Sequence, residues 1–224
     1  MGNGILSGET ASSPAVVRSP PRAIEARFSP YLEEAQRLIH AGVAEMAETS
    51  SLDPRVSDIV RRAGLSNKAF YRHFKSKDEL LLAVLEESMR TLAQQFEERL
   101  SPAMPPIERV RAWVWGVLEQ ALDPGRSAEH RPMLVHQGRL LDSLGAQLWD
   151  HVAQRIGLLQ SAIAEAREAG DLPESVDPMR DGEAVFHLAM GWMHGRVVGR
   201  VTPPREEAER VVAFALRGLG FPEA

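Results

Sequence analysis

Apolar residues recur every three or four positions along most of this chain, which is the spacing of one face of an α-helix. The first such stripe runs from Leu32 to Met46, with charged residues on the opposite face. Ser29 and Pro30 precede it, and this pair is typical of a helix N-cap and first turn. We therefore expect the first helix to begin at Ser29, after a disordered N-terminal arm of residues 1–28 that is rich in Gly, Ser and Pro.

Short helical segments follow this first helix in quick succession. One carries its apolar residues between 56 and 63 and ends at Gly64, a residue type that readily adopts the left-handed conformation of a helix C-terminus. Ser66 is a suitable N-cap for the next short helix, and Ser76 for a longer one. One helix followed by two short helices with a tight turn between them is the pattern of a helix-turn-helix, whose second short helix enters the DNA major groove.

The remainder of the chain repeats the helical pattern on a larger scale. The expected helices cover residues 107–122, a region that continues to about 144, residues 146–169, residues 177–200 and a last segment ending near 218, with a turn cluster at 123–127. No stretch of useful length alternates apolar and polar residues as a β-strand does. The sequence therefore predicts an all-α fold, with an N-terminal three-helix domain at residues 29–76 and a helical C-terminal domain at residues 77–224.

Positive charge is concentrated in one segment of an acidic protein. The formal net charge is −5, yet the segment from Arg55 to Lys77 contains seven Lys and Arg residues and a single acid, Asp58. A local basic patch on an acidic protein indicates a surface that meets an anion, such as the DNA backbone. A solvated charged face is the alternative, although such faces usually mix both signs.

Several classes of protein are disfavoured by what the sequence lacks. There is no Cys, so disulfides, thiolate nucleophiles and Cys-ligated metals are excluded. The longest nearly apolar run, residues 184–193, is far shorter than the roughly 20 residues of a membrane span, and no secretory signal is evident. Phosphate-binding glycine loops, nucleophile elbows and HExxH pairs are missing. We expect a cytoplasmic protein that is not an enzyme, uses no cofactor and has no membrane partner.

One cluster of potential metal ligands remains open to two interpretations. Glu183, His187 and His194 share a face of an expected helix at spacings of four and seven residues. Such a set can begin a metal site. A polar strip in a helix interface explains the same residues equally well, and we expect no metal.

The basic segment also resembles a known family, the TetR-type transcriptional regulators. The matching residues are VSDIVRRAGLS at 56–66, FYRHF at 70–74 and SKDEL at 76–80. The resemblance implies that the N-terminal domain binds DNA and that the variable C-terminal domain binds a ligand and forms a dimer. It extends over about thirty residues, and the rest of the chain shares only the family's helical layout.

The resemblance implies a set of DNA contacts on and around the third helix. The implied residues are Arg55, Ser57, Asn67, Lys68, Ala69, Tyr71, Arg72, His73 and Lys77. Tyr71, His73 and Lys77 match phosphate contacts of the family, and residues 67–69 occupy positions that face bases in relatives. Arg55 stands where the family commonly has a phosphate-binding Thr. Lys68 and Ala69 replace a frequent Gly-Thr pair, so the operator sequence cannot be carried over.

The last two expected helices are candidates for a dimer interface. Glycines at 191, 195 and 199 recur every four residues, and each costs roughly 0.8–1.0 kcal/mol relative to Ala inside a helix, so a close packing contact is expected. Close packing within one subunit is the alternative. The candidate interface residues are Gly191, Gly195, Gly199, Val212 and Leu216. The family forms its dimer with these helices, which implies a homodimer that reads a palindromic operator.

A small-molecule effector is the remaining expected partner. Trp113, Trp149, Phe186, Met190 and Met193 are the candidate residues for a partly apolar pocket, although most such residues are simply core. We therefore expect a ligand-responsive, sequence-specific DNA-binding regulator, and specifically a repressor that the effector releases from double-stranded DNA. The alternative is a helical sensor or interaction protein that does not bind DNA sequence-specifically.

Overall fold

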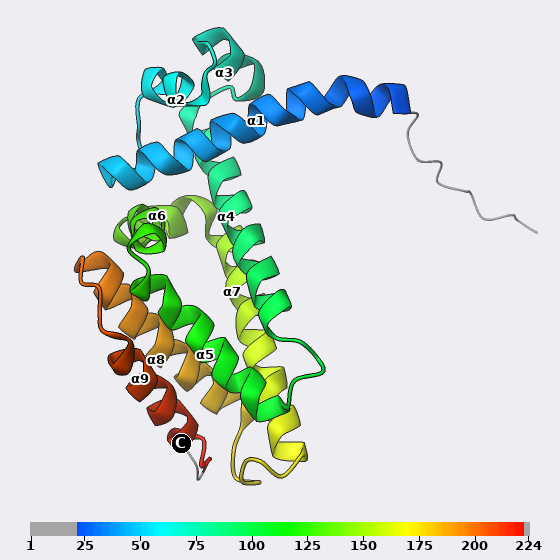
Figure 1. Cartoon of the computed structure of the whole chain (residues 1–224), viewed down its shortest axis with the longest axis vertical. Helices are drawn as coiled ribbons and strands as arrows, with labels where there is room; N and C mark the ends of the chain where they lie inside the picture. Colours follow the sequence, from blue (N-terminus) through cyan, green and yellow to red (C-terminus); the bar gives the residue numbers. More distant parts are fainter. Residues whose placement is uncertain (1–21, 222–224) are drawn as a thin grey trace, which may run out of the picture.

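The described part of the chain is built from α-helices alone. Our computed structural model describes residues 22–221, and within them all side chains except those of residues 22–29, 139 and 141–149. The helices of this part are α1 (Arg22–Thr49), α2 (Val56–Ala63), α3 (Asn67–His73), α4 (Lys77–Arg99), α5 (Pro106–Leu122), α6 (Pro124–Val135), α7 (Gln137–Glu168), α8 (Pro178–Val198) and α9 (Arg205–Gly218). The expected all-α fold is confirmed (Figure 1).

The first helix begins earlier than the sequence pattern suggested. α1 starts at Arg22 and continues through Pro30, so the expected start at Ser29 is wrong, and the arm expected over residues 1–28 overlaps the helix. A Pro inside a helix removes one hydrogen bond and clashes with the preceding turn. Pro30 is exposed, so water can reach the carbonyl that loses its partner. The helix formers Ala, Glu and Arg before it favour continuation. Residues 1–21 lie outside the described residues.

The N-terminal helices pack around one hydrophobic cluster, which we call the first core. Leu38 of α1, Ile59 of α2 and Phe70 of α3 are fully buried in it. The cluster continues along α4 as far as Leu85 and includes Leu140 of α7. The division expected at residues 76 and 77 falls at the start of α4, whereas the first core extends beyond it.

A second, larger cluster fills the C-terminal part, and we call it the second core. α5 lies at its centre, packed between α7, α8 and α9 (Figure 1). Trp113 of α5 is fully buried and its indole N–H donates a hydrogen bond to the carbonyl oxygen of Arg155 at 3.0 Å. Its ring lies 6.0 Å from that of Phe186, centroid to centroid. These aromatics therefore join α5 to α7 and α8.

α6 connects the two halves of the molecule. It packs against α1 on one side and α8 on the other, and the Nε of Arg131 donates to the carbonyl oxygen of Val197 at 3.0 Å. The turn expected at residues 123–127 is instead the start of α6, because Asp123 caps it by accepting hydrogen bonds from the two following backbone N–H groups of the first turn. The next break comes at His136 rather than near residue 145, so α7 is longer than expected.

Candidate nucleic-acid interface and effector cavity

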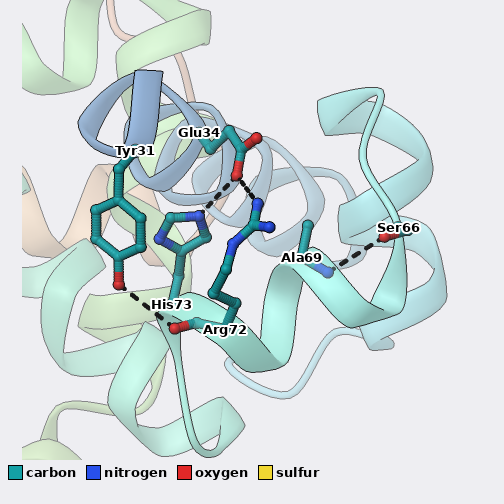
Figure 2. A network of polar contacts seen from close by, with 6 residues as sticks. All are labelled: Tyr31, Glu34, Ser66, Ala69, Arg72 and His73. Atoms are coloured by element: carbon teal, nitrogen blue, oxygen red, sulfur yellow. Dashed lines mark hydrogen bonds and ion pairs between the residues drawn. The ribbon is translucent and has the colours of Figure 1, made fainter. Parts of the chain in front are cut away.

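The turn between α2 and α3 is fixed by two residues with different roles. Gly64 adopts the left-handed conformation (φ 65°, ψ 35°) that ends α2, as the sequence predicted. Ser66 has an extended backbone, and its hydroxyl oxygen accepts a hydrogen bond from the N–H of Ala69 at 3.2 Å (Figure 2). The predicted N-cap is thereby confirmed. Only Leu65 separates these two residues, so the direction of α3 relative to α2 is closely defined.

α3 divides into a buried face and an exposed face. Phe70 is fully buried, and Ala69 is 6% exposed. Asn67, Lys68 and Tyr71 are exposed, with 60% of the Tyr71 surface accessible. The side chain of Ala69 has little accessible surface in this structure, and its expected contact with a base stays a prediction. In a seven-residue helix with Phe70 at the core, the preceding position also turns towards α1 and α2.

A single carboxylate from α1 holds the C-terminal end of α3. Glu34 accepts a hydrogen bond from the Nε2 of His73 at 2.9 Å, and the same oxygen pairs with the guanidinium of Arg72 (Figure 2). Both hydrogen bonds lower the pKa of the Glu34 carboxyl from its usual value, and the hydrogen bond from His73 has the larger effect. The hydroxyl of Tyr31 adds a longer hydrogen bond of 3.4 Å to the carbonyl oxygen of Arg72.

His73 is part of the packing between α1 and α3 rather than an open contact. Its side chain is 1% exposed, and its ring lies 4.1 Å from that of Tyr31, centroid to centroid. The imidazole is committed to Glu34 in this conformation, and the expected contact of His73 with a phosphate stays a prediction. No signal within α3 indicates this role. The partner lies 39 residues earlier in the chain.

Acidic neighbours neutralise much of the basic segment. Arg62 pairs with Glu45 at 2.7 Å and with Glu48 at 2.6 Å, which ties α2 to α1. Lys77 pairs with Asp53 across the helix-turn-helix. Arg61 and Asp58 pair at 2.9 Å within α2.

The bases that remain without an ion-pair partner among the described residues are Arg55, Lys68 and Lys75. All three are exposed, as is Ser57 in the first turn of α2. The charge available to an anion thus lies at both ends of α3 and at the start of α2. This distribution suits contact with two DNA strands on either side of a groove.

A cavity of about 410 Å³ lies where the two halves of the molecule meet. α1 contributes His40, Val43 and Ala44 to its wall. The wall residues from α4, α5 and α6 are Glu87, Ser88, Thr91, Leu92, Gln95, Gln120, Arg126, Glu129, His130 and Met133. Its volume lies within the 300–1,000 Å³ that is typical of ligand pockets, and nine of its thirteen wall residues are polar or charged. No sequence pattern marks it, because four helices from distant parts of the chain form it.

The pocket residues expected from the sequence do not line this cavity. Trp113, Phe186 and Met193 are buried in the second core, and Met190 packs against it, so their role in binding a ligand stays a prediction. Trp149 lies outside the described side chains. Large apolar side chains fill cores more often than they line cavities.

The candidate dimer-interface residues divide into an exposed group on α8 and a buried group on α9. Gly191 and Gly195 are exposed on α8, and an added Cβ at either would meet no atom within 4 Å. Gly199 is exposed just after the helix ends. Val212 and Leu216 are buried in the second core, so the expectation that they form a surface is wrong.

The opposite face of α9 exposes a residue that the sequence reading missed. Phe214 is 61% exposed, although it lies only two residues from each of the buried positions 212 and 216. The missed signal was the helical spacing itself, because a residue two positions from a buried one lies on the other side of the helix.

The described residues contain no group of three or more His, Asp or Glu side chains arranged to hold a metal ion. Glu183 and His187 do approach to 3.7 Å, but both are exposed. Among the helices that the structure describes, none is long and apolar enough to cross a bilayer.

The short helix α3 has an exposed face that can enter the major groove, the turn before it is closely defined, and α1 packs against both α2 and α3. The protein is therefore a helix-turn-helix DNA-binding protein with an α-helical C-terminal domain. A family model described as "Bacterial regulatory proteins, tetR family" matches residues 38–84, which cover the C-terminal part of α1, all of α2 and α3 and the start of α4. Residues 38–84 therefore form a TetR-family helix-turn-helix domain. TetR-family regulators bind DNA and effector ligands, act as dimers and are not enzymes.

Similar proteins extend over most of the chain. The transcriptional regulator AcuR of Cereibacter sphaeroides is 28% identical over 189 residues, 80% of this chain and 83% of its own. The transcriptional repressor DhaR of a Mycobacterium species is 26% identical over 185 residues, 82% of this chain and 91% of its own. A solved TetR regulator from Haloarcula marismortui has the same fold, with a TM-score of 0.71 at 16% identity over 84% of this chain and 96% of its own.

Proposed function

We propose that the protein is a homodimeric, effector-responsive repressor that binds a palindromic operator in double-stranded DNA. Its site of action would be the cytoplasm, where a regulator meets chromosomal DNA. The exposed start of α3 supports sequence reading by Asn67 and Lys68, because an amide suits adenine and an ammonium suits guanine in the major groove. Tyr71, Arg72 and Lys77 would bind phosphates, together with Arg55 and Ser57 at the start of α2.

One observation carries the effector part of the proposal: α1 takes part in both sites. Glu34 holds the recognition helix, and six residues further along the same helix His40 forms part of the cavity wall. Six residues of α-helix span roughly 9 Å. A ligand that favours a different position of α1 would therefore change the orientation of α3 directly. It would shift the balance of the two states only by the difference in its affinity for them.

The position of α6 extends this effect to the dimer. α6 forms part of the cavity wall, contacts α1 and is hydrogen-bonded to the end of α8 through Arg131. The exposed glycines of α8 and the exposed Phe214 of α9 make these helices the best-supported surface for a second subunit. A two-fold dimer would present two recognition helices about one DNA turn apart, or a multiple of it.

Selection from random double-stranded DNA at near-physiological salt tests the proposal. The expected result is an enriched palindrome whose half-site spacing reports the separation of the two α3 helices. A library that remains unenriched, with folded protein, would contradict it and favour a helical sensor or interaction protein without sequence-specific binding. A steep salt dependence of DNA affinity alone does not distinguish a sequence-specific regulator from a protein that binds DNA non-specifically, because non-specific binding shows the same dependence.

A further inference from the structure

Two neutral side chains in the wall of the 410 Å³ cavity donate their hydrogen bonds within their own helices. The hydroxyl of Ser88 donates to the carbonyl oxygen of Val84 at 2.8 Å in α4. The Nε2 of Gln120 donates to the carbonyl oxygen of Gly116 at 3.1 Å in α5. No described residue donates to the Oγ of Ser88 or to the Oε1 of Gln120. Because Gln120 lines the cavity and is only 5% exposed, a donor for its Oε1 must come from inside the cavity.

His130 of α6 repeats this arrangement in the same wall. Its Nδ1 lies 2.7 Å from the carbonyl oxygen of Arg126. A carbonyl oxygen can only accept, so Nδ1 carries the proton and donates. Burial lowers the pKa of His130, so the ring is neutral near pH 7 and its Nε2 is an acceptor. No described residue donates to this Nε2.

The cavity therefore presents acceptors from three helices without the donors that would satisfy them. Ser88, Gln120 and His130 contribute one such acceptor each. Acceptors in an enclosed site are unfavourable until a donor reaches them, so a ligand that supplies donors is favoured. A second cavity, of about 520 Å³, lacks this feature. Its wall contains no Ser, Thr, Asn, Gln or His, and its three arginines each pair with a carboxylate.

The charges of the wall favour a ligand without net charge. Both carboxylate oxygens of Glu87 accept hydrogen bonds from Arg90, at 2.6 and 3.0 Å. The other charged residues of the wall are Arg126 and Glu129, one of each sign. Neither a cation nor an anion would find an excess of opposite charge to offset the loss of its hydration.

From these observations, and resting on the proposed effector response, we propose that the effector is a neutral polyol of about monosaccharide size, whose hydroxyl groups donate to Ser88, Gln120 and His130 in the 410 Å³ cavity. A hydroxyl group is both a donor and an acceptor, so it can also accept from Arg126, another residue of the wall. An ammonium group donates but cannot accept, and it brings a charge. The C–H groups of a polyol suit the four apolar residues of the wall, which are Val43, Ala44, Leu92 and Met133.

The test measures direct binding to the full-length protein. Glucose, galactose, ribose, myo-inositol and erythritol are compared with their O-methylated derivatives, which lack the donors, and with glucuronate and glucosamine, which carry a charge. We expect at least one neutral polyol to raise the melting temperature at millimolar concentration. Glucose and galactose should differ in this effect, because exclusion from the protein surface would act alike for both stereoisomers.

Three outcomes would overturn the inference. They are stabilisation by no polyol of the set, equal stabilisation by the O-methylated derivatives, and stronger stabilisation by a charged sugar. The stabilising polyol should also lower the affinity for the selected operator. A polyol that binds without this effect is not the effector, and contradicts the inference as well.

The Gln120→Met variant separates a ligand-binding role from a structural one. It removes the Oε1 and keeps a flexible side chain of similar size, so without ligand it should melt close to the wild type. Its affinity for the stabilising polyol should fall by roughly three- to ten-fold, the effect of losing one neutral hydrogen bond. A variant that keeps the wild-type affinity refutes the inference. Ser88→Ala provides a second variant if the first folds poorly.

Gln160→Met is the matched control. The Nε2 of Gln160 also donates to a backbone carbonyl, that of Met179 at 3.2 Å, but this residue of α7 is not part of the cavity wall. Its substitution should leave polyol affinity unchanged. Operator binding is measured separately on each preparation. Protein that binds an operator but no polyol contradicts the inference and leaves DNA recognition intact. Protein that binds a polyol but selects no DNA sequence contradicts the proposed function instead.

Discussion

Glu34 and His73 lie 39 residues apart in the chain, and their side chains are hydrogen-bonded at 2.9 Å. The helix that we propose reads DNA is thereby fixed to the helix that also forms part of the wall of the 410 Å³ cavity. The same carboxylate oxygen pairs with Arg72, a residue we propose to meet DNA. Glu34 therefore acts on both the stability of the DNA-binding domain and its charge, and each effect can be tested.

The stability effect of Glu34 should depend on pH. Hydrogen bonds from His73 and Arg72 lower its pKa in the folded protein below the ordinary value of 4.5. A carboxyl whose folded pKa is lowered stabilises the fold above its unfolded pKa, and loses that contribution as the pH falls through the folded pKa. Wild-type protein should therefore be more stable than Glu34→Gln at neutral pH, with the difference shrinking below about pH 4.5. Urea unfolding across this range measures it, and a pH-independent difference would contradict the role of the charge.

The charge effect should appear in DNA binding. Glu34→Gln removes the carboxylate that competes with phosphate for Arg72, so affinity for DNA of any sequence should rise. One additional phosphate contact should make the slope of log affinity against log salt steeper by about 0.9. Fluorescence anisotropy on random duplexes at several salt concentrations gives this slope. Glu48→Gln is the control, because its partner Arg62 remains tied to Glu45. An unchanged slope in Glu34→Gln would mean that Arg72 does not reach the backbone.

Reading and positioning residues on α3 should behave differently. Asn67→Ala and Lys68→Ala should change which bases are preferred, each by about 1–3 kcal/mol at the affected position. Tyr71→Phe and Lys77→Ala should weaken binding to all sequences alike, because phosphate contacts carry no sequence information. Affinities for single-base variants of the selected operator distinguish these outcomes. A uniform loss in all four variants would disprove the division.

The cap of α3 should be measurable as stability. Ser66→Ala removes the hydroxyl that accepts the Ala69 N–H, and should lower the free energy of unfolding by about 1 kcal/mol. Ser57→Ala is the control, since Ser57 is exposed within the first turn of α2 and makes no cap. Urea denaturation of both variants provides the comparison. Equal losses would show that the cap itself contributes nothing.

The exposed glycines of α8 offer a test of the dimer. An added Cβ at Gly191 meets nothing within one subunit, so Gly191→Glu should not disturb the subunit fold. A second α8 packed closely against it would be displaced, and analytical ultracentrifugation should show monomers. Gly138→Glu on α7 is the control, because it is also exposed and has open space around it. A Gly191→Glu protein that remains dimeric would place the interface elsewhere.

Local signals in the sequence predicted local structure well. Gly64 and Ser66 identified the turn because their effects are local. Gly64 adopts the left-handed conformation itself, and Ser66 accepts a hydrogen bond from the N–H group three residues later. The expected start of α1 at Ser29 is wrong because an exposed Pro is tolerated inside a helix when water replaces the lost hydrogen-bond partner, and the helix formers before Pro30 favour continuation.

Features that depend on tertiary contacts were beyond the sequence. Ala69 and His73 match positions that meet DNA in relatives, yet their burial depends on how α1 packs over α3. Leu216 lies on the face of α9 that packs in the second core, and the sequence of α9 alone does not show which of its faces meets α5. The cavity needs His40 and His130, which are 90 positions apart in the numbering, and neither carries a local motif.

α4 belongs to both cores. Leu80, Val84 and Leu85 pack in the first core, whereas Leu92 and Phe96 pack in the second, and the helix is continuous between them. The DNA-binding domain is therefore not a detachable module, and a fragment that stopped at residue 76 would expose much of its own interior. Chimaeras that exchange effector domains between such regulators should be joined inside α4, between Leu85 and Leu92, in helical register. A junction at the loop before α4 would separate residues that fold together.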